Sequence, residues 1–333
     1  MGRTTLKDVG DHVGTSAKTV SNVINGTGWV SDDLKHRVLT AIVELGYRPN
    51  AAARQLRSGR SGMVTLAVPD LAQPYFAELA SALVRAAEER GVTVLISQTN
   101  GQLEAERRIS NGIGIPVSDG LILSALALSA EDFAQRSDTT PLVLLGEHIA
   151  SSGFHHVTVD NEAAAFAATS YLISKGRRRI AAVGAKMTIP KETADLRLSG
   201  YHAALTAAGI PADRALVRVV DQFERADGAT AASALIDSGA EFDAVFAFND
   251  LLALGAMHTL VSSGVRVPDD VAIIGFDDIK EGRYSSPALT SVSPNKVAIA
   301  RAALDVALRS DDEPETDSLE TMIPFEIVER ASA

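Results

Sequence analysis

Apolar and polar positions follow two different patterns along this chain of 333 residues. Up to Gly46, apolar residues recur at helical spacing and are separated by short polar breaks. From Met63 onward, short apolar runs alternate with longer helical patterns. Apolar runs joined by helical crossovers are typical of parallel strands that helices cover on both faces. The pattern therefore predicts a small helical domain followed by a larger α/β body.

Three short helices are predicted in residues 1–48, and a residue suited to an N-cap precedes each of them. The helices are Leu6–Val13, Ala17–Ile24 and Asp32–Leu45, and the capping residues are Thr5, Ser16 and Ser31. Two helices around a tight glycine-containing turn, braced by a third helix, are typical of a helix-turn-helix. We therefore expect a helix-turn-helix domain in residues 1–48.

Residues 49–61 connect the two parts of the chain. Ala51–Arg57 favours a helix but is too short to be stable alone, and Ser58–Gly62 is a flexible Ser/Gly segment. The segment is predicted to be a hinge helix and linker that becomes helical only when another surface holds it.

The body, residues 62–333, contains about ten candidate strands, which suggests two doubly wound parallel-sheet subdomains rather than one. The strands are Val64–Pro69, Thr93–Gln98, Gly120–Ser124, Leu142–Leu145, His156–Val159, Ile180–Val183, Val217–Val220, Ala244–Phe248, Val271–Gly275 and one around Phe325–Val328. The clearest helical patterns are Phe76–Arg90, Ala163–Lys175, Leu196–Ala208, Leu251–Ser263 and Lys296–Leu308. We expect an N-lobe of about 62–161 plus 292–322 and a C-lobe of about 162–291 plus 323–333.

Charge is distributed unevenly over this acidic chain. The formal net charge is -11, but residues 1–60 hold nine basic and five acidic side chains and carry +4, which leaves -15 for the rest. A basic head can meet phosphates while an acidic body discourages non-specific contact with nucleic acid. The absence of cysteine excludes disulfides and thiolate sites and fits a reducing cytoplasm. No apolar run approaches a membrane span, and the N-terminus has no signal-peptide core, so we expect a cytoplasmic protein.

The second helix of the head carries side chains that suit DNA recognition. Such a helix presents its first turns to the major groove. There Lys18 can donate to guanine, Asn22 can pair with adenine, and Ala17 can touch a thymine methyl. The hydroxyls of Ser16, Thr19 and Ser21 suit phosphates. Spacing alone fits equally well a three-helix protein-binding module with a solvated polar face.

Leu56 is a large apolar residue among arginines in the linker. An apolar wedge entering a widened minor groove, with Arg54 and Arg57 near phosphates, would account for it. The alternative is that Leu56 packs on the body or on the hinge of a partner chain.

Polar and aromatic residues follow the strands of the body, at the edge where ligands bind in open α/β sheets. Aromatic faces combined with carboxylates, an amide and a guanidinium suit sugars, whose hydroxyls take hydrogen bonds while their C–H faces stack on rings. The strongest candidates are Tyr75, Phe76, Glu147, Arg197, Phe223, Asn249 and Asp277, and neighbouring candidates are Asp70, Gln73, Gly146, His148, Asp221, Asp250 and Asp278.

Each of these residues also has a plain structural explanation. Asn249 and Asp277 could be helix N-caps, Arg197 could form a salt bridge, and Phe76 and Phe223 could belong to the core. The chain has no G-x-S-x-G, Walker or G-x-G-x-x-G motif at a suitable place, and adjacent His155 and His156 point to opposite faces of a strand. We therefore expect neither an enzyme nor a metal or cofactor site.

Four segments together resemble the LacI/GalR family of bacterial transcriptional regulators, in the right order and over essentially the whole chain. They are "TLKDVGDHVGTSAKTVSNVINGTGWVS", "LGYRPNAAARQLRSGRS", "VTVDNEAAAFAATSYLISKGRRRIAAVG" and "VPDDVAIIGFDD…SSPALTSVSPN". The resemblance implies a body like the type I periplasmic sugar-binding proteins, and a homodimer that binds near-palindromic operator DNA. It implies that Leu56 wedges between base pairs and supports Ala17 and Lys18 as base readers. We also expect Thr5, Asn25 and Asn50 to belong to the DNA-binding set. It also implies that Tyr75, Phe76, Arg197, Phe223, Asn249 and Asp277 contact an effector.

Three positions depart from the family pattern. Arginine is very common in the family where this chain has Asn22, which implies a changed operator preference at one half-site position. Alanine is usual at Gly10, and glycine inside a helix costs about 1 kcal/mol, which predicts a marginal head. Aspartate is common at Gly146, so either Glu147 replaces it or the effector presents a different group there.

We therefore expect a dimeric repressor of carbohydrate-utilisation genes whose operator affinity is set by a small molecule, most simply a sugar. A solute-binding protein without DNA function, or a regulator that responds to a nucleobase or nucleoside, remains the alternative. The sequence leaves open the effector's identity and whether it induces or co-represses.

Overall fold

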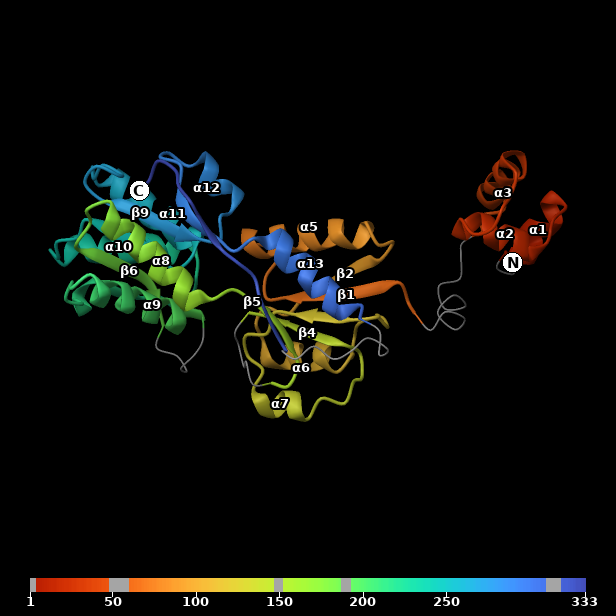
Figure 1. The fold of residues 1–333 in the computed structure, drawn as a ribbon, viewed down its shortest axis with the longest axis horizontal. Helices are drawn as coiled ribbons and strands as arrows, with labels where there is room; N and C mark the ends of the chain where they lie inside the picture. The colour runs from red at the N-terminus through yellow and green to blue at the C-terminus, as the bar shows by residue number, and fades with distance from the viewer. Residues whose placement is uncertain (1–3, 48–59, 147–151, 187–192, 310–318) are drawn as a thin grey trace. The chain divides into compact units, whose positions relative to one another are not determined.

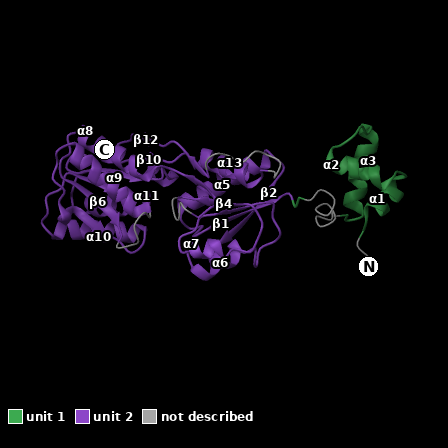
Figure 2. Cartoon of the chain, turned by 60° about the horizontal axis from the view of Figure 1, so that its bottom comes forward, with its two compact units in different colours: residues 1–61 green, residues 62–333 purple. Residues whose placement is uncertain are grey.

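The computed structural model describes residues 4–47, 60–146, 152–186, 193–309 and 319–333 (Figure 1). Its contacts divide the chain into two compact units, residues 1–61 and residues 62–333 (Figure 2). Six candidate site residues lie outside the described residues: Asn50, Arg54, Leu56, Arg57, Glu147 and His148. Their proposed roles stay predictions.

The described part of the head, residues 4–47, contains three helices, α1 (Leu6–Val13), α2 (Ala17–Asn25) and α3 (Asp32–Glu44), as the hydrophobic pattern predicted to within one residue at each end. Thr5, Ser16 and Ser31 act as their N-caps, since each side chain accepts a hydrogen bond from a backbone N–H of the first turn. The buried core of the described head is small and consists of Val9, Val13, Val20, Val23, Val38 and Ala41. Arg37 Nη2 donates to the carbonyl of Val13 at 2.6 Å and so ties α3 to the turn between α1 and α2.

Gly10 has a structural reason that the sequence pattern did not show. A Cβ at this position would lie 2.7 Å from the backbone oxygen of Thr15 and 3.3 Å from the backbone nitrogen of Ala17. Glycine therefore allows α1 to approach the start of α2 closely. Its cost in helix propensity is offset by this packing, so the expected marginal head does not follow from Gly10 alone.

The N-lobe is built on an all-parallel sheet with the strand order β11-β5-β4-β3-β1-β2. Its strands are β1 (Met63–Val68), β2 (Thr93–Gln98), β3 (Leu121–Leu123), β4 (Leu142–Leu145), β5 (His155–Thr158) and β11 (Glu320–Met322). Its helices are α5 (Pro74–Glu88), α6 (Leu103–Ser110), α7 (Ala130–Ala134) and α13 (Lys296–Ala307). The helices α5 and α13 lie together on one side of the sheet, with α6 and α7 on the other (Figure 1).

The C-lobe is built on a second sheet with the strand order β12-β10-β9-β8-β6-β7, in which only β12 runs antiparallel to its neighbour. Its strands are β6 (Ile180–Ala185), β7 (Val217–Val219), β8 (Ala244–Ala247), β9 (Ala272–Phe276), β10 (Thr290–Ser293) and β12 (Glu326–Val328). Its helices are α8 (Asn161–Ser174), α9 (Thr193–Ala207), α10 (Arg225–Asp237), α11 (Asp250–Ser262) and α12 (Lys280–Tyr284), with a 3₁₀ turn at Arg214–Leu216.

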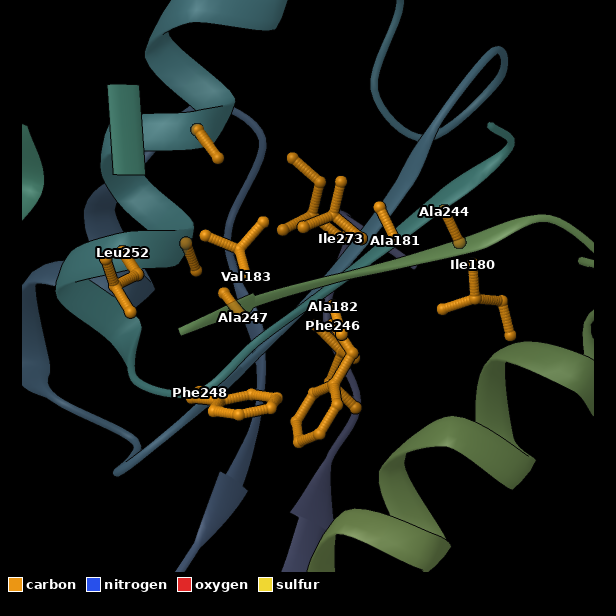
Figure 3. Packing of buried hydrophobic residues seen from close by; sticks show 14 of the residues in the cluster. Ile180, Ala181, Ala182, Val183, Ala244, Phe246, Ala247, Phe248, Leu252 and Ile273 are labelled. Atoms are coloured by element: carbon orange, nitrogen blue, oxygen red, sulfur yellow. The ribbon is translucent and has the colours of Figure 1, made fainter. Parts of the chain in front are cut away.

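The central strands of both sheets are buried on both faces, which explains why they appear in the sequence as continuous apolar runs. In the C-lobe, the rings of Phe246 and Phe248 lie on one side of the sheet, with centroids 5.2 Å apart, while Val183 and Ala247 lie on the other (Figure 3). The edge strand β2 instead has only exposed and partly buried positions. The prediction of an α/β fold with two parallel-sheet subdomains is confirmed.

Two short strands escaped the sequence pattern and move a predicted boundary. Strand β10 pairs with β9 and β12 and so belongs to the C-lobe, although residue 292 was expected to begin the N-lobe segment. The chain therefore returns to the N-lobe only after Ser293. Strand β11 joins β5 in the N-lobe. Among the described residues, no helix is long and apolar enough to cross a membrane.

Candidate DNA-binding and effector-binding sites

Helix α2 separates an apolar face from a polar face, as a recognition helix requires. Val20 and Val23 are buried and Ile24 packs against the head core, whereas Lys18 is exposed. The Lys18 ammonium forms no ion pair or hydrogen bond within the described residues. Lys18 is thus free to donate to a base or a phosphate.

The predicted phosphate-binding hydroxyls are held in place by hydrogen bonds within the head. The Thr5 hydroxyl donates to Asp8 Oδ2 at 2.7 Å, and the hydroxyls of Ser16 and Thr19 lie 2.9 Å apart. Asn25 Nδ2 donates to the Ser21 carbonyl at 2.8 Å and to its hydroxyl at 3.1 Å. These bonds fix the rotamers, while each hydroxyl oxygen keeps capacity for a further partner.

Asn22 contacts the loop that follows α2. The Thr27 hydroxyl donates to Asn22 Oδ1 at the long distance of 3.5 Å, and Thr27 N donates to the Asn22 carbonyl at 3.0 Å. A bidentate pair with adenine needs both Oδ1 and Nδ2 of an asparagine. The weak Thr27 contact would have to be shared or broken in such a pair.

A cavity of about 350 Å³ in the body is lined by residues of both lobes. In each sheet the second strand lies on one side of the first and the third strand lies on the other, so the strand order reverses between β1 and β3 and between β6 and β8, although these strands are parallel. Ligands in open α/β sheets bind beyond the carboxyl ends of the strands at such switch points. Residues that follow β1, β3, β6 and β8 line this cavity, including Phe76, Ser124, Lys186 and Asn249.

All described members of the predicted effector set line this one cavity. They are Tyr75, Phe76, Arg197, Phe223, Asn249 and Asp277. The rings of Tyr75 and Phe76 meet edge to face, with centroids 5.2 Å apart. Gln73, also predicted, lies in the lining as well, and so does Gly146, whose backbone φ is 89°. The aromatic pair comes from the N-lobe, whereas the polar groups Arg197, Asn249 and Asp277 come from the C-lobe.

Arg197 is 7% exposed, so it is not a surface side chain. Its Nε donates to Asn161 Oδ1 at 2.7 Å, and its Nη1 donates to the carbonyl of Phe248. Its guanidinium lies 3.5 Å from the centroid of the Phe276 ring. These contacts orient a buried cation at the cavity wall.

Asn249 is an N-cap as well as a cavity residue. Its Oδ1 accepts from Leu252 N at 2.8 Å at the start of α11, and its Nδ2 donates to the Phe223 carbonyl at 3.0 Å. Asn249 thereby joins the start of α11 to the aromatic residue that follows β7. Asn249 therefore has a structural role as a helix cap and also lines the cavity.

Asp277 caps no helix, because α12 begins three residues later with Ile279 at its N-cap. Burial raises the pKa of Asp277 to about 6, although Arg197 and Lys296 act in the opposite direction. Its neighbour Asp250 has a pKa raised well above the usual value, first by burial and then by the charge of Asp277. Asp250 accepts from Ile279 N at 2.8 Å and from the Ser291 hydroxyl at 2.6 Å, so it holds the loop that carries Asp277.

Hydrogen bonds cross directly between the lobes beside the cavity. Gln73 Nε2 donates to Glu224 Oε1 at 3.2 Å, and Lys280 N donates to Glu78 Oε1 at 2.8 Å. Lys296 Nζ lies 3.2 Å from Glu78 Oε2 and donates to the Asp278 carbonyl at 3.1 Å. The wall of the cavity therefore includes contacts that depend on how the lobes meet.

The predicted set omitted several cavity residues, among them Lys186, Asn161 and Gln222. Lys186 directly follows β6 and could have been found by the same rule that identified Asn249 after β8. Asn161 opens α8, and its role is visible only from its hydrogen bond to Arg197. Asp160 has a structural role, because it caps α8 by accepting from Ala163 N at 2.8 Å.

Two family models match the chain. Residues 5–50 match the bacterial regulatory proteins of the lacI family, and residues 169–333 match a periplasmic binding protein-like domain. The ribose operon repressor of Halalkalibacterium halodurans is 31% identical over 328 residues, which cover 98% of this chain and 96% of that protein.

Solved structures agree with these matches. The complex of the transcriptional regulator CelR with cellobiose is 30% identical, with a TM-score of 0.70 over 99% of this chain and 100% of that chain. A LacI-type transcription regulator from Bifidobacterium animalis is 30% identical, with a TM-score of 0.74 over 81% of this chain and 99% of that chain. Similarity to such regulators over nearly the whole length means that this chain belongs to the LacI family of bacterial regulatory proteins.

Proposed function

We propose that this protein is a sequence-specific repressor whose affinity for operator DNA is set by a sugar bound in the cavity of the body. The observation that carries the proposal is the combination, in one LacI-family chain, of a capped recognition helix with a cavity lined by aromatic, carboxylate, amide and guanidinium groups. Binding to bacterial DNA places its action in the cytoplasm.

On DNA, the recognition helix α2 supplies the base contacts. Lys18 donates to guanine, Ala17 contacts a thymine methyl, and Asn22 pairs with adenine. Two heads of a homodimer bind adjacent major grooves of a near-palindromic operator, and the hinges fold into the minor groove between them, with Leu56 as the wedge. The phosphate backbone of the DNA is contacted by polar and basic side chains of the head and the hinge. These are Thr5, Ser16, Thr19, Ser21, Asn25, Asn50, Arg54 and Arg57.

In the body, the sugar stacks on Phe223 and the pair Tyr75 and Phe76 while its hydroxyls bond to Asn249 and Asp277. The similarity to a ribose operon repressor and to a regulator in complex with cellobiose supports a sugar. A ligand that bonds to both lobes changes the balance of the cross-lobe contacts at Glu78 and Glu224. This change is transmitted to the hinge, which is too short to fold alone and so responds to a small bias.

The DNA-binding part of the proposal is tested by selecting operator sequences from random duplexes with the purified protein. Lys18→Ala should weaken binding to the selected operator by roughly tenfold or more, since a good base contact is worth ~1–3 kcal/mol. Lys7→Ala is the control, because the Lys7 ammonium already pairs with Asp11 at 3.2 Å. Equal losses in the two variants, or no salt dependence of binding, would contradict specific recognition by α2.

The hinge is tested separately with Leu56→Ala. Removing the wedge should reduce operator affinity in a gel-shift titration while leaving sugar binding to the body unchanged. Unchanged operator affinity would exclude the wedge.

The coupling between sugar binding and operator affinity is tested with Asp277→Ala. This variant should abolish the effect of a bound sugar on operator affinity while leaving operator affinity in the absence of sugar intact. Asp270→Ala on the surface, where Asp270 pairs with Arg266 at 2.5 Å, is the control. A normal response to sugar in the Asp277 variant would show that the effector binds elsewhere.

A further inference from the structure

More positively charged than negatively charged side chains line the described cavity. Within the described lining, three side chains carry a formal charge, the two cations Lys186 and Arg197 and the single carboxylate Asp277. All three belong to the C-lobe, so the N-lobe wall of aromatic and hydroxyl groups adds no negative charge there. The described cavity is therefore cationic, inside a body that is strongly acidic overall.

Lys186 differs from the other cations near the cavity because, among the described residues, no group forms a hydrogen bond or ion pair with its ammonium. Its Nζ lies 5.1 Å from the centroid of the Phe223 ring. Arg197 is bonded to Asn161 and Phe248, and Lys296 pairs with Glu78. Lys186 is partly buried, so its charge has lost part of its hydration, and no described residue supplies a counter-charge to it.

The start of α9 adds to the positive potential. Thr193 and Ala194, the first two residues of this 15-residue helix, line the same cavity. The N–H groups of a first helical turn have no partner within the helix and favour negative charge nearby. A compact ammonium and a helix N-terminus on one wall form an arrangement that suits an anionic group.

We propose that the effector is an anionic sugar, whose phosphate or carboxylate pairs with Lys186 while its ring stacks on Phe223. This inference rests on the proposed function of the cavity as the effector site. A neutral sugar would use Asp277, Asn249 and the aromatic rings but would leave Lys186 unpaired. The volume of about 350 Å³ suits one sugar ring with a charged substituent.

Calorimetric titration of the full-length protein with matched sugars tests the charge preference. The probes are D-glucose with D-glucose 6-phosphate and D-glucuronate, and D-ribose with D-ribose 5-phosphate, each at low and high sodium chloride. In at least one series a charged member should bind at least tenfold more tightly than its neutral counterpart, and added salt should reduce that ratio. The phosphate and carboxylate members distinguish the two sources of charge, and inorganic phosphate alone should bind far more weakly than a sugar phosphate.

Variants of Lys186 test whether this side chain causes the preference for charged sugars over neutral ones. Lys186→Gln should lower the ratio of charged to neutral affinity by about tenfold, and Lys186→Arg should retain most of the ratio. Lys280→Gln, an exposed lysine of the same lobe outside the cavity lining, should change nothing. A ratio that survives in Lys186→Gln overturns the assignment.

The remaining outcomes separate this inference from the proposed function. If neutral sugars bind as tightly as charged ones and alter operator affinity, the inference is wrong and the function stands. If a charged sugar binds through Lys186 without altering operator affinity, the inference stands and the proposed regulation is wrong. If no sugar of either class binds to a protein that still binds operator DNA, both the inference and the sugar part of the function are wrong.

Discussion

At the scale of single residues, the cavity wall combines structural and ligand-facing roles in the same side chains. Asn249 caps α11 and joins it to Phe223, and Arg197 is fixed by Asn161 before any ligand arrives. Asp277 is the exception, because its carboxylate is partly buried and its pKa is raised. Groups held by the protein in advance cost less to order on binding. Asp277 is therefore the side chain whose state should change most when a ligand enters.

The raised pKa of Asp277 predicts how stability depends on pH. Between the ordinary pKa of 3.8 and about 6, the folded protein holds a proton that the unfolded chain releases. This contribution to stability is complete below pH 3.8 and is lost as pH rises through about 6. The Asp277→Asn variant does not lose this stability, because asparagine does not titrate. The free energy of unfolding of the variant minus that of the parent should therefore rise between pH 4 and 6, by up to roughly 3 kcal/mol, and then level off.

Urea unfolding at several pH values, followed by circular dichroism, measures this difference. Asp270→Asn is the control, since hydrogen bonds from Arg266 lower the pKa of Asp270 to about 2. The contribution of Asp270 to stability is present above pH 3.8 and is lost only as pH falls toward 2. The difference in free energy of unfolding between Asp270→Asn and the parent should therefore stay constant between pH 4 and 7.5. A flat profile for both variants would show that Asp277 titrates normally.

At the scale of elements, close helix packing decides where small residues must stand. Helices α8 and α9 pack together in the C-lobe, and Gly200 of α9 lies against the backbone of α8. A Cβ at Gly200 would overlap the Glu162 carbonyl and lie 2.8 Å from Phe166 N. Helix α8 begins with Asn161, which binds Arg197 of α9, so this packing also positions one wall of the cavity.

Gly200→Ala should therefore destabilise the body, although alanine is the better helix former by about 1 kcal/mol. Overpacking of this kind costs about 1–3 kcal/mol or more. Ala203→Gly, at an exposed position of α9, should lose only about 1 kcal/mol through helix propensity. The test is chemical unfolding of both variants, and a stabilised Gly200→Ala protein would contradict the close contact.

At the scale of the whole molecule, the head and the body have separate cores of unequal size. The described head core has six buried apolar residues, whereas the body has three larger clusters across its two sheets. A small domain buries a smaller share of its surface and is only marginally stable. The two units are therefore expected to unfold as separate cooperative units.

Scanning calorimetry of the full chain should show two transitions, with the head unfolding first. Operator DNA should raise the lower transition, because a ligand stabilises the unit that it binds. Deleting residues 1–61 should remove the lower transition and DNA binding while the body keeps its own transition and its sugar affinity. A single transition that shifts on deletion would mean that the two units fold as one.

Much of this protein followed from the sequence by itself, because local rules decide it. Helical periodicity and caps placed α1, α2 and α3 within a residue, and apolar runs placed most central strands. The rule that ligands bind beyond strand ends identified residues from both lobes that line one cavity.

Tertiary structure alone decided the rest. Strands β10 and β11 are three or four residues long and exist only because a neighbouring strand supplies their hydrogen bonds. The need for glycine at Gly10 and Gly200 comes from backbone atoms of other segments. The position of the Lys186 ammonium over Phe223, with no other partner among the described residues, depends on two residues brought together from different strand ends. Periodicity and propensity act between near neighbours in sequence, whereas unpaired charge and close approach are properties of atoms that only the fold brings together.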